Sequence, residues 1–140
     1  MIVLDTNVVS ELMRAEPSSE VVAWVDRQVA DDVFLTAVTL AEVVFGIARL
    51  PDGRRKQSLA DLVEATVADD FDHRVAAFDA PAAVHYADIA ARREHAGRPI
   101  SAADALIAAI CRSHGAVLAT RNVDDFGGVG ITVVDPWTYR

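Results

Sequence analysis

The chain has 140 residues, a formal net charge of −8 and a sequence pI of about 4.8. Hydrophobic residues make up 52% of it, a share that excludes intrinsic disorder and suffices for one folded core. The single cysteine, Cys111, excludes an internal disulfide and suits a reducing compartment, and no apolar run approaches the ~20 residues of a membrane span. We therefore expect one cytoplasmic domain over residues 1–140. Its bulk charge disfavours nucleic acids unless the acids gather in a cation site.

Short apolar runs alternate with segments of helical period in the first half of the chain. The expected elements there are a strand at 1–4, helices at 6–14 and 18–29, a strand at 33–36, and helices at 39–50 and 54–67. The turn residues Pro51, Asp52 and Gly53 separate the last two helices.

The second half continues the alternation. We expect a strand at 74–79, helices at 81–95 and 101–114, a strand at 116–120, a loop at 122–130 and a strand at 131–135. Gly115 ends the second of these helices. This order predicts an α/β fold in which a parallel sheet is covered by helices on both faces.

Ligands in such folds bind beyond the carboxyl ends of the strands, and acids are dense there. Asp5 directly follows the first strand, and Glu42 and Asp104 stand three residues after Thr39 and Ser101. Each acid alone suits a helix cap or a capping box as well as a ligand site. Together they place a carboxylate in the first turn of three helices, whose starts can converge on one crevice.

Converging carboxylates need a counter-charge. Two of them 4 Å apart repel by about 4 kcal/mol at an effective dielectric near 20, so one protonates or a cation binds. Oxygen ligands favour Mg²⁺ or Mn²⁺ over Zn²⁺, and the chain has no His-x-x-x-His or Cys-x-x-Cys spacing for a softer ion.

A fourth candidate segment follows the strand at 116–120. There Asp125 or Asp124 can add a carboxylate, while Thr120 and Asn122 can orient ligands or waters. The alternative is an ordinary turn, since Asn, Asp and Gly are turn residues.

Four segments are familiar in this order: LDTNVVSEL, TAVTLAEVVFGI, ISAADALIAAI and LATRNVDDF, with a closing DPW. They resemble the PIN-domain ribonucleases, specifically the VapC/FitB-like toxins of bacterial toxin–antitoxin pairs. The resemblance implies a three-layer α/β/α PIN-like fold with a central, mostly parallel sheet of about five strands. It also implies metal binding by Asp5, Glu42 and Asp104, RNA cleavage, homodimers, and inhibition by a small antitoxin. Some relatives carry an acid where Asn122 stands, which leaves open whether a second metal binds firmly.

The resulting hypothesis is a Mg²⁺-dependent endoribonuclease toxin that hydrolyses RNA with a metal-activated water. Asp5 and Asp104 would hold the metal, with Glu42 and Asp125 completing the acidic site. Thr6 and Thr120 would position water, and Asn7 would hold Asp5 in place. The expected partners are RNA, a DNA-binding VapB/FitA-like antitoxin and a second copy of the chain, with no membrane.

Two other functions compete with this hypothesis. A haloacid-dehalogenase-type phosphatase needs a second Asp two residues after the first, and Asn7 stands there. A catalytically weak PIN-like subunit that binds a partner would lack acids that this chain retains.

Two surface features allow two interpretations each. Basic residues can frame an RNA entrance or form a solvated surface: Arg14, Arg49, Arg54, Arg55, Lys56, Arg92, Arg93 and Arg98. Apolar residues can form an antitoxin groove or belong to the core: Val43, Val44, Ile47, Leu50, Leu59 and Leu62.

Overall fold

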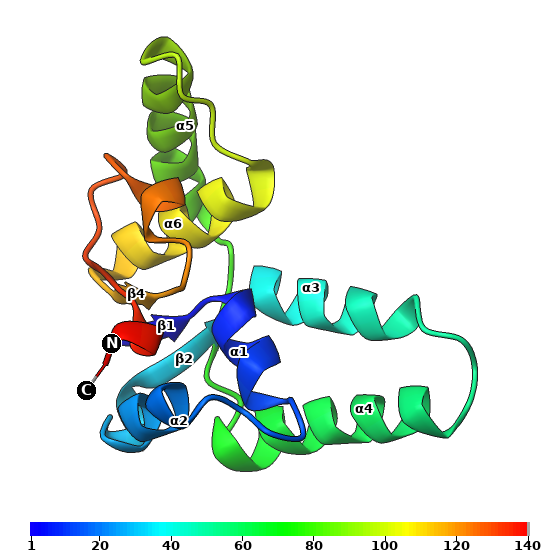
Figure 1. Ribbon diagram of the computed structural model, residues 1–140. Coiled ribbons are helices and arrows are strands. Elements are labelled where there is room, and N and C mark those ends of the chain that lie inside the picture. The colour runs from blue at the N-terminus through cyan, green and yellow to red at the C-terminus, as the bar shows by residue number, and fades with distance from the viewer. Residues whose placement is uncertain (140) are drawn as a thin grey trace.

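The computed structural model describes residues 1–139 and contains a five-stranded sheet in which every pairing is parallel (Figure 1). The strands are β1 (Ile2–Leu4), β2 (Val33–Thr36), β3 (Val75–Ala76), β4 (Val117–Ala119) and β5 (Val133–Val134), and their order in the sheet is β3-β2-β1-β4-β5. The chain runs outward from β1 to β3 and then returns to β4 on the other side of β1. The carboxyl ends of β1 and β4 therefore flank the switch point, where such sheets bind ligands.

Six α-helices surround the sheet, and Figure 1 shows α5 and α6 on one side, with α1, α2 and α4 toward the other. Their bounds are α1 (Thr6–Leu12), α2 (Ser19–Asp26), α3 (Ala37–Ala48), α4 (Arg54–Ala65), α5 (Ala80–His95) and α6 (Ala102–His114). Helices α3 and α4 project together as a hairpin. No helix within residues 1–139 is long and apolar enough to cross a membrane.

The strands carry apolar side chains on both faces, which makes two cores. Val3 and Leu118 pack with Ile107 and Phe126 on one face, and the neighbouring Leu4 packs with α1 and α2 on the other. Because successive strand residues point to opposite faces, each short strand serves both cores. The predicted three-layer α/β/α fold with a parallel sheet of five strands is confirmed.

Helix caps differ from the prediction at one of the site helices. Helix α3 begins at Ala37 rather than at residue 39, because the buried Thr36 caps it: its Oγ1 accepts a hydrogen bond from the Thr39 N–H at 3.0 Å. The capping box of Thr39 and Glu42 is therefore wrong, and Glu42 is not a capping residue. At α6 the predicted cap is confirmed, since Ser101 Oγ accepts from the Asp104 N–H at 3.2 Å.

Other boundaries also shift. The strand predicted at 74–79 shrinks to Val75–Ala76, because Asp79 caps α5 through a 3.1 Å hydrogen bond from the Ala82 N–H. The helix predicted at 54–67 changes after Ala65 into one π-helical turn, η2 (Thr66–Asp70). The helix predicted at 18–29 ends at Asp26. The loop predicted at 122–130 contains a 3-10 turn, η3 (Val123–Phe126), and further 3-10 turns are η1 (Ala30–Asp32) and η4 (Pro136–Thr138). Gly115 ends α6 as predicted, with the positive φ of 63° that glycine adopts without strain.

Candidate active site

Asp5 stands between the end of β1 and the start of α1 and is 4% exposed. It does cap α1, because Oδ1 accepts a 2.8 Å hydrogen bond from the Thr6 N–H. Its other oxygen, Oδ2, accepts from the Thr120 hydroxyl at 2.8 Å and from the Asn7 side-chain amide at 3.3 Å. The capping interpretation of Asp5 is therefore confirmed through Oδ1, while Oδ2 makes the contacts with Thr120 and Asn7.

Thr120 and Asn7 connect the carboxyl end of β4 to the start of α1. The buried Thr120 hydroxyl accepts from the Asn7 amide at 3.0 Å and from the Asn122 backbone N–H at 3.1 Å. Asn7 Oδ1 in turn accepts from the Arg121 backbone N–H at 3.1 Å. Three of the predicted positioning residues thus meet at Asp5, with Thr120 and Asn7 in direct contact and Asn122 linked through its backbone.

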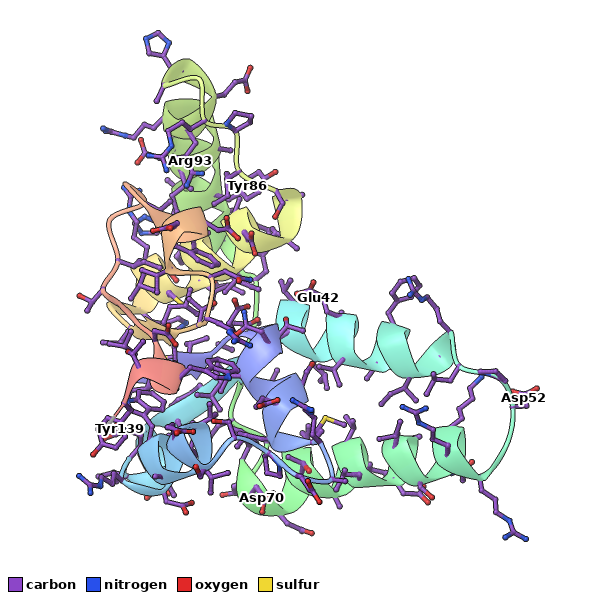
Figure 2. All side chains as sticks on the ribbon, viewed as in Figure 1. Glu42, Asp52, Asp70, Tyr86, Arg93 and Tyr139 are labelled. Carbon is purple, nitrogen blue, oxygen red and sulfur yellow. The ribbon has the colours of Figure 1, made fainter. Side chains whose placement is uncertain are left out.

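Glu42 reaches the same place from α3. The Thr6 hydroxyl donates to Glu42 Oε1 at 2.7 Å and lies 3.4 Å from the hydroxyl of the buried Thr39. Figure 2 shows Glu42 at the start of α3, next to α1, while Asp52 marks the far tip of the α3–α4 hairpin. Thr6 therefore holds an exposed carboxylate of α3 beside the buried one of β1.

The candidate acids influence the pKa values of Asp5 and Asp104 through their charges. Burial raises the pKa of Asp5 above its usual value; hydrogen bonds from Thr120 and Thr6 lower it, and the charges of Asp104 and Glu42 raise it again. Asp104 also has a raised pKa, first from burial. A hydrogen bond to Ser101 lowers that pKa, while the charges of Asp125 and Glu42 raise it. The fold thus brings Asp5, Glu42, Asp104 and Asp125 within electrostatic reach of one another.

The four carboxylates are the kind of ligand that a hard cation binds. Across the described residues, 1–139, no three His, Cys, Asp or Glu side chains stand close enough to make a finished metal-binding group. The four acids nevertheless offer only oxygen, the ligand type of Mg²⁺ and Mn²⁺. Two of them, Glu42 and Asp125, are exposed, so their side chains are free to move toward a cation.

Asp125 and Asn122 occupy the turn after β4, and both side chains are exposed. The Asp125 backbone N–H donates to the Asn122 carbonyl at 3.1 Å, which closes the first turn of η3. The ordinary-turn interpretation is therefore correct for the backbone, while the Asp125 carboxylate still acts on Asp104 through its charge.

Two buried charged residues lie near the site: Glu11, which the sequence interpretation missed, and Arg93, which it considered only for an RNA entrance or a solvated surface. Glu11, 8% exposed on α1, pairs with Arg14 at 3.0 Å and accepts from the Ser18 N–H at 3.3 Å; these contacts lower its pKa. Arg93, also 8% exposed, lies on α5 and donates to carbonyls of two loops that border the acids. The i,i+3 spacing of Glu11 and Arg14 was a visible signal for their ion pair, whereas nothing local distinguishes Arg93 from Arg92.

The apolar residues considered as a groove divide between core and surface. Ile47 is buried and Val43 half-buried, whereas Val44 and Leu62 are 48% and 43% exposed. A hollow of about 830 Å³ runs from Thr6 and Glu42 along the α3–α4 hairpin to Leu59. It joins the acidic site to part of the apolar face.

Comparisons with known proteins agree with this geometry. The family model of the PIN domain matches residues 2–130. The chain is 42% identical to the VapC ribonuclease Y4jK of Sinorhizobium fredii, over 98% of both chains. It is 40% identical to toxin FitB of Neisseria gonorrhoeae, over 98% of this chain and 99% of that one. A solved structure of FitAB bound to an IR36 DNA fragment contains a chain that is 39% identical, with a TM-score of 0.92 over 100% of this chain and 98% of that one.

The sequence match covers the segments that carry Asp5, Glu42, Asp104 and Asp125, and the structural match covers the whole sheet and its helices. The chain therefore belongs to the PIN-domain family, in its VapC/FitB-like group.

Proposed function

We propose that this protein is a divalent-metal-dependent endoribonuclease and the toxin of a toxin–antitoxin pair. The observation that carries the proposal is Asp5, a buried carboxylate at the switch point of the sheet whose pKa burial and the charges of Asp104 and Glu42 raise. A buried acid that lies near other acids costs stability even when it accepts hydrogen bonds, and functional sites are where such costs concentrate. The relatives support the reaction class, since Y4jK is named a ribonuclease and FitB a toxin.

Asp5 and Asp104 would hold the metal, with Glu42 and Asp125 as further ligands, directly or through water. A bound Mg²⁺, or Mn²⁺ in its place, would acidify a water and offset negative charge on the phosphate during hydrolysis. The Thr120 and Asn7 contacts fix the Asp5 carboxylate before any ion arrives, so this one ligand would have little to reorganise. The Thr6 hydroxyl orients Glu42 through its hydrogen bond, and it would be free to hold water if Glu42 bound the metal directly.

The test is RNA cleavage by the Asp5→Asn variant. We expect the natural chain to cleave RNA in Mg²⁺ and to lose this activity in EDTA. The cleavage rate of the variant should be at least about 1,000-fold lower, because without this ligand the ion would no longer acidify a water or offset the charge on the phosphate. Asp69→Asn, at an exposed acid of η2, is the matched control and should cleave normally. An Asp5→Asn protein that remains fully active would refute the proposal. The partner-binding alternative, a catalytically weak PIN-like subunit, predicts no cleavage by any form.

Three further features belong to the same proposal. We expect residues 1–140 to act as one PIN domain, as a homodimer, in the cytoplasm. A cognate VapB/FitA-like antitoxin, itself DNA-binding, would lie along the hollow that begins at Glu42 and Thr6, where a basic side chain can face the acids and an apolar one can meet Leu50 and Leu59. Co-purification of this chain with the product of an adjacent short reading frame tests that partner.

A further inference from the structure

An acidic nuclease must hold a polyanion next to a ring of acids. The net charge of −8 and the carboxylates at the switch point both repel an RNA strand. Mg²⁺ offsets this repulsion only at the phosphate it contacts. A neighbouring phosphate needs a cationic surface close to the acids.

A hollow beside α5 has that character. Its volume is about 630 Å³, and it lies between the C-terminal part of α5 and the glycines that follow η3. Its charged or titratable lining residues are Arg92, Arg93, His95 and Arg98, and no acid contributes to the lining. The larger hollow beside Glu42 has two acids in its wall, Glu16 and Glu42.

The arginines of this hollow differ in how far their charge is already used. Arg92 pairs with Asp88 at 2.8 Å, so its charge is offset. The buried Arg93 donates only to backbone carbonyls: Nε to Arg98 at 2.6 Å, and Nη1 to Asp125 at 2.9 Å and Gly127 at 3.1 Å. No ion pair within residues 1–139 includes Arg93 or Arg98. Two guanidinium charges here therefore lack a carboxylate partner.

The side chain of Arg98 lies close to the loop at Gly127. A Cβ added at Gly127 would stand 3.5 Å from Nη2 and 3.8 Å from Nη1 of Arg98. The exposed Arg98 guanidinium thus rests against the Gly127 backbone with its charge open to solvent. A guanidinium presents paired N–H donors that match two phosphate oxygens.

The hollow also adjoins the acids. Arg93 binds the Asp125 carbonyl directly, and its charge lowers the pKa of Asp104 against the larger effect of burial. Arg98 lies three residues before Ser101, the cap of the helix that carries Asp104. An RNA strand whose scissile phosphate lies at Asp104 therefore has the hollow with Arg93 and Arg98 beside it.

We propose that the hollow lined by Arg93, Arg98 and the Gly127–Gly128 backbone binds a phosphate of the RNA strand next to the cleaved one. This inference rests on the proposed ribonuclease function and names the surface through which an acidic chain holds its substrate. Arg98 makes the contact, and Arg93 supplies buried positive charge behind it.

The test compares two substitutions that remove the same charge. Arg98→Gln removes the proposed contact, and Arg27→Gln removes an exposed arginine at the end of α2, a helix that lies away from the hollow. Binding of a fluorescein-labelled single-stranded RNA 12-mer is measured by anisotropy in EDTA, over a range of salt concentrations. We expect Arg98→Gln to weaken binding roughly fivefold and to reduce the slope of log K against log salt by about 0.7, with binding by Arg27→Gln unchanged. In Mg²⁺, Arg98→Gln should raise KM for the RNA and leave kcat within about twofold.

The outcomes separate this inference from the nuclease proposal. Equal salt slopes and affinities for Arg98→Gln and Arg27→Gln, with normal melting temperatures, would overturn the phosphate subsite even if the natural chain cleaves RNA. If the natural chain binds RNA through Arg98 but no form cleaves it, the subsite stands and the nuclease proposal fails.

Discussion

Arg93→Met removes a buried cation that ties two loops to α5. The Arg93 guanidinium donates three hydrogen bonds, to the carbonyls of Arg98, Asp125 and Gly127, at distances from 2.6 to 3.1 Å. Methionine fills much of the aliphatic volume of arginine, so the substitution removes the guanidinium and creates little cavity. The three carbonyls then lose their donor, and with it the link between the loop before α6 and the turn that carries Asp125.

The expected loss follows from these contacts. Hydrogen bonds from a charged group contribute about 1.5 to 3 kcal/mol each, but water can reach these loop carbonyls in the variant, so we take about 1 kcal/mol for each bond. The free energy of unfolding should fall by about 3 kcal/mol. A domain of 140 residues has an unfolding entropy of about 0.3 kcal/mol/K near its midpoint, so the melting temperature should drop by about 10 °C.

The assay is thermal unfolding followed by circular dichroism, with Arg92→Met as the control. Arg92 is the next residue on α5, its side chain is 74% exposed, and it has an i,i+4 ion pair with Asp88. Such pairs contribute about 0.3 to 0.5 kcal/mol, which corresponds to a drop of at most about 2 °C. Equal drops for the two variants would show that burial and the carbonyl contacts of Arg93 do not stabilise the loops as argued.

Two further predictions concern the site helices. In EDTA, the free energy of unfolding of Asp5→Asn minus that of the natural chain should increase between pH 4 and pH 7, measured by urea unfolding. The reason is that the fold raises the pKa of Asp5 from its usual 3.8. The stability that the natural chain gains from protonated Asp5 is therefore fully present below pH 3.8 and is lost as the pH rises through the raised pKa. A difference in unfolding free energy between the two proteins that does not change with pH would contradict this reasoning. Thr36→Val should lower the melting temperature by about 3 °C, because it removes the cap of α3. Glu42→Gln should change the melting temperature by less than about 1 °C. A larger drop for Glu42→Gln than for Thr36→Val would instead support the Thr39–Glu42 capping box.

Much of the architecture followed from local patterns. Alternating apolar runs and helical periods predicted the parallel sheet, and the place of Asp5 directly after a strand put it at the ligand-binding edge. Ser101 was correctly predicted as the cap of α6. Asn7 was expected beside Asp5, and its amide lies 3.3 Å from Asp5 Oδ2. These inferences hold because backbone geometry and helix ends depend mainly on neighbours in the chain.

The tertiary structure decided which of two equivalent local choices was used. Thr36 and Thr39 both suit a helix cap, and only the end of β2 determines that the helix starts after Thr36. Arg92 and Arg93 are adjacent and identical in type, yet one is exposed and the other buried, because the turn after β4 packs over one face of α5 alone. Glu42 and Asp104, 62 residues apart, affect one another only through the sheet order that places α3 and α6 near β1. The sequence by itself determined the elements and the acids at their ends, whereas burial, charge pairing and the meeting of those acids required the packing of distant segments, which no local pattern encodes.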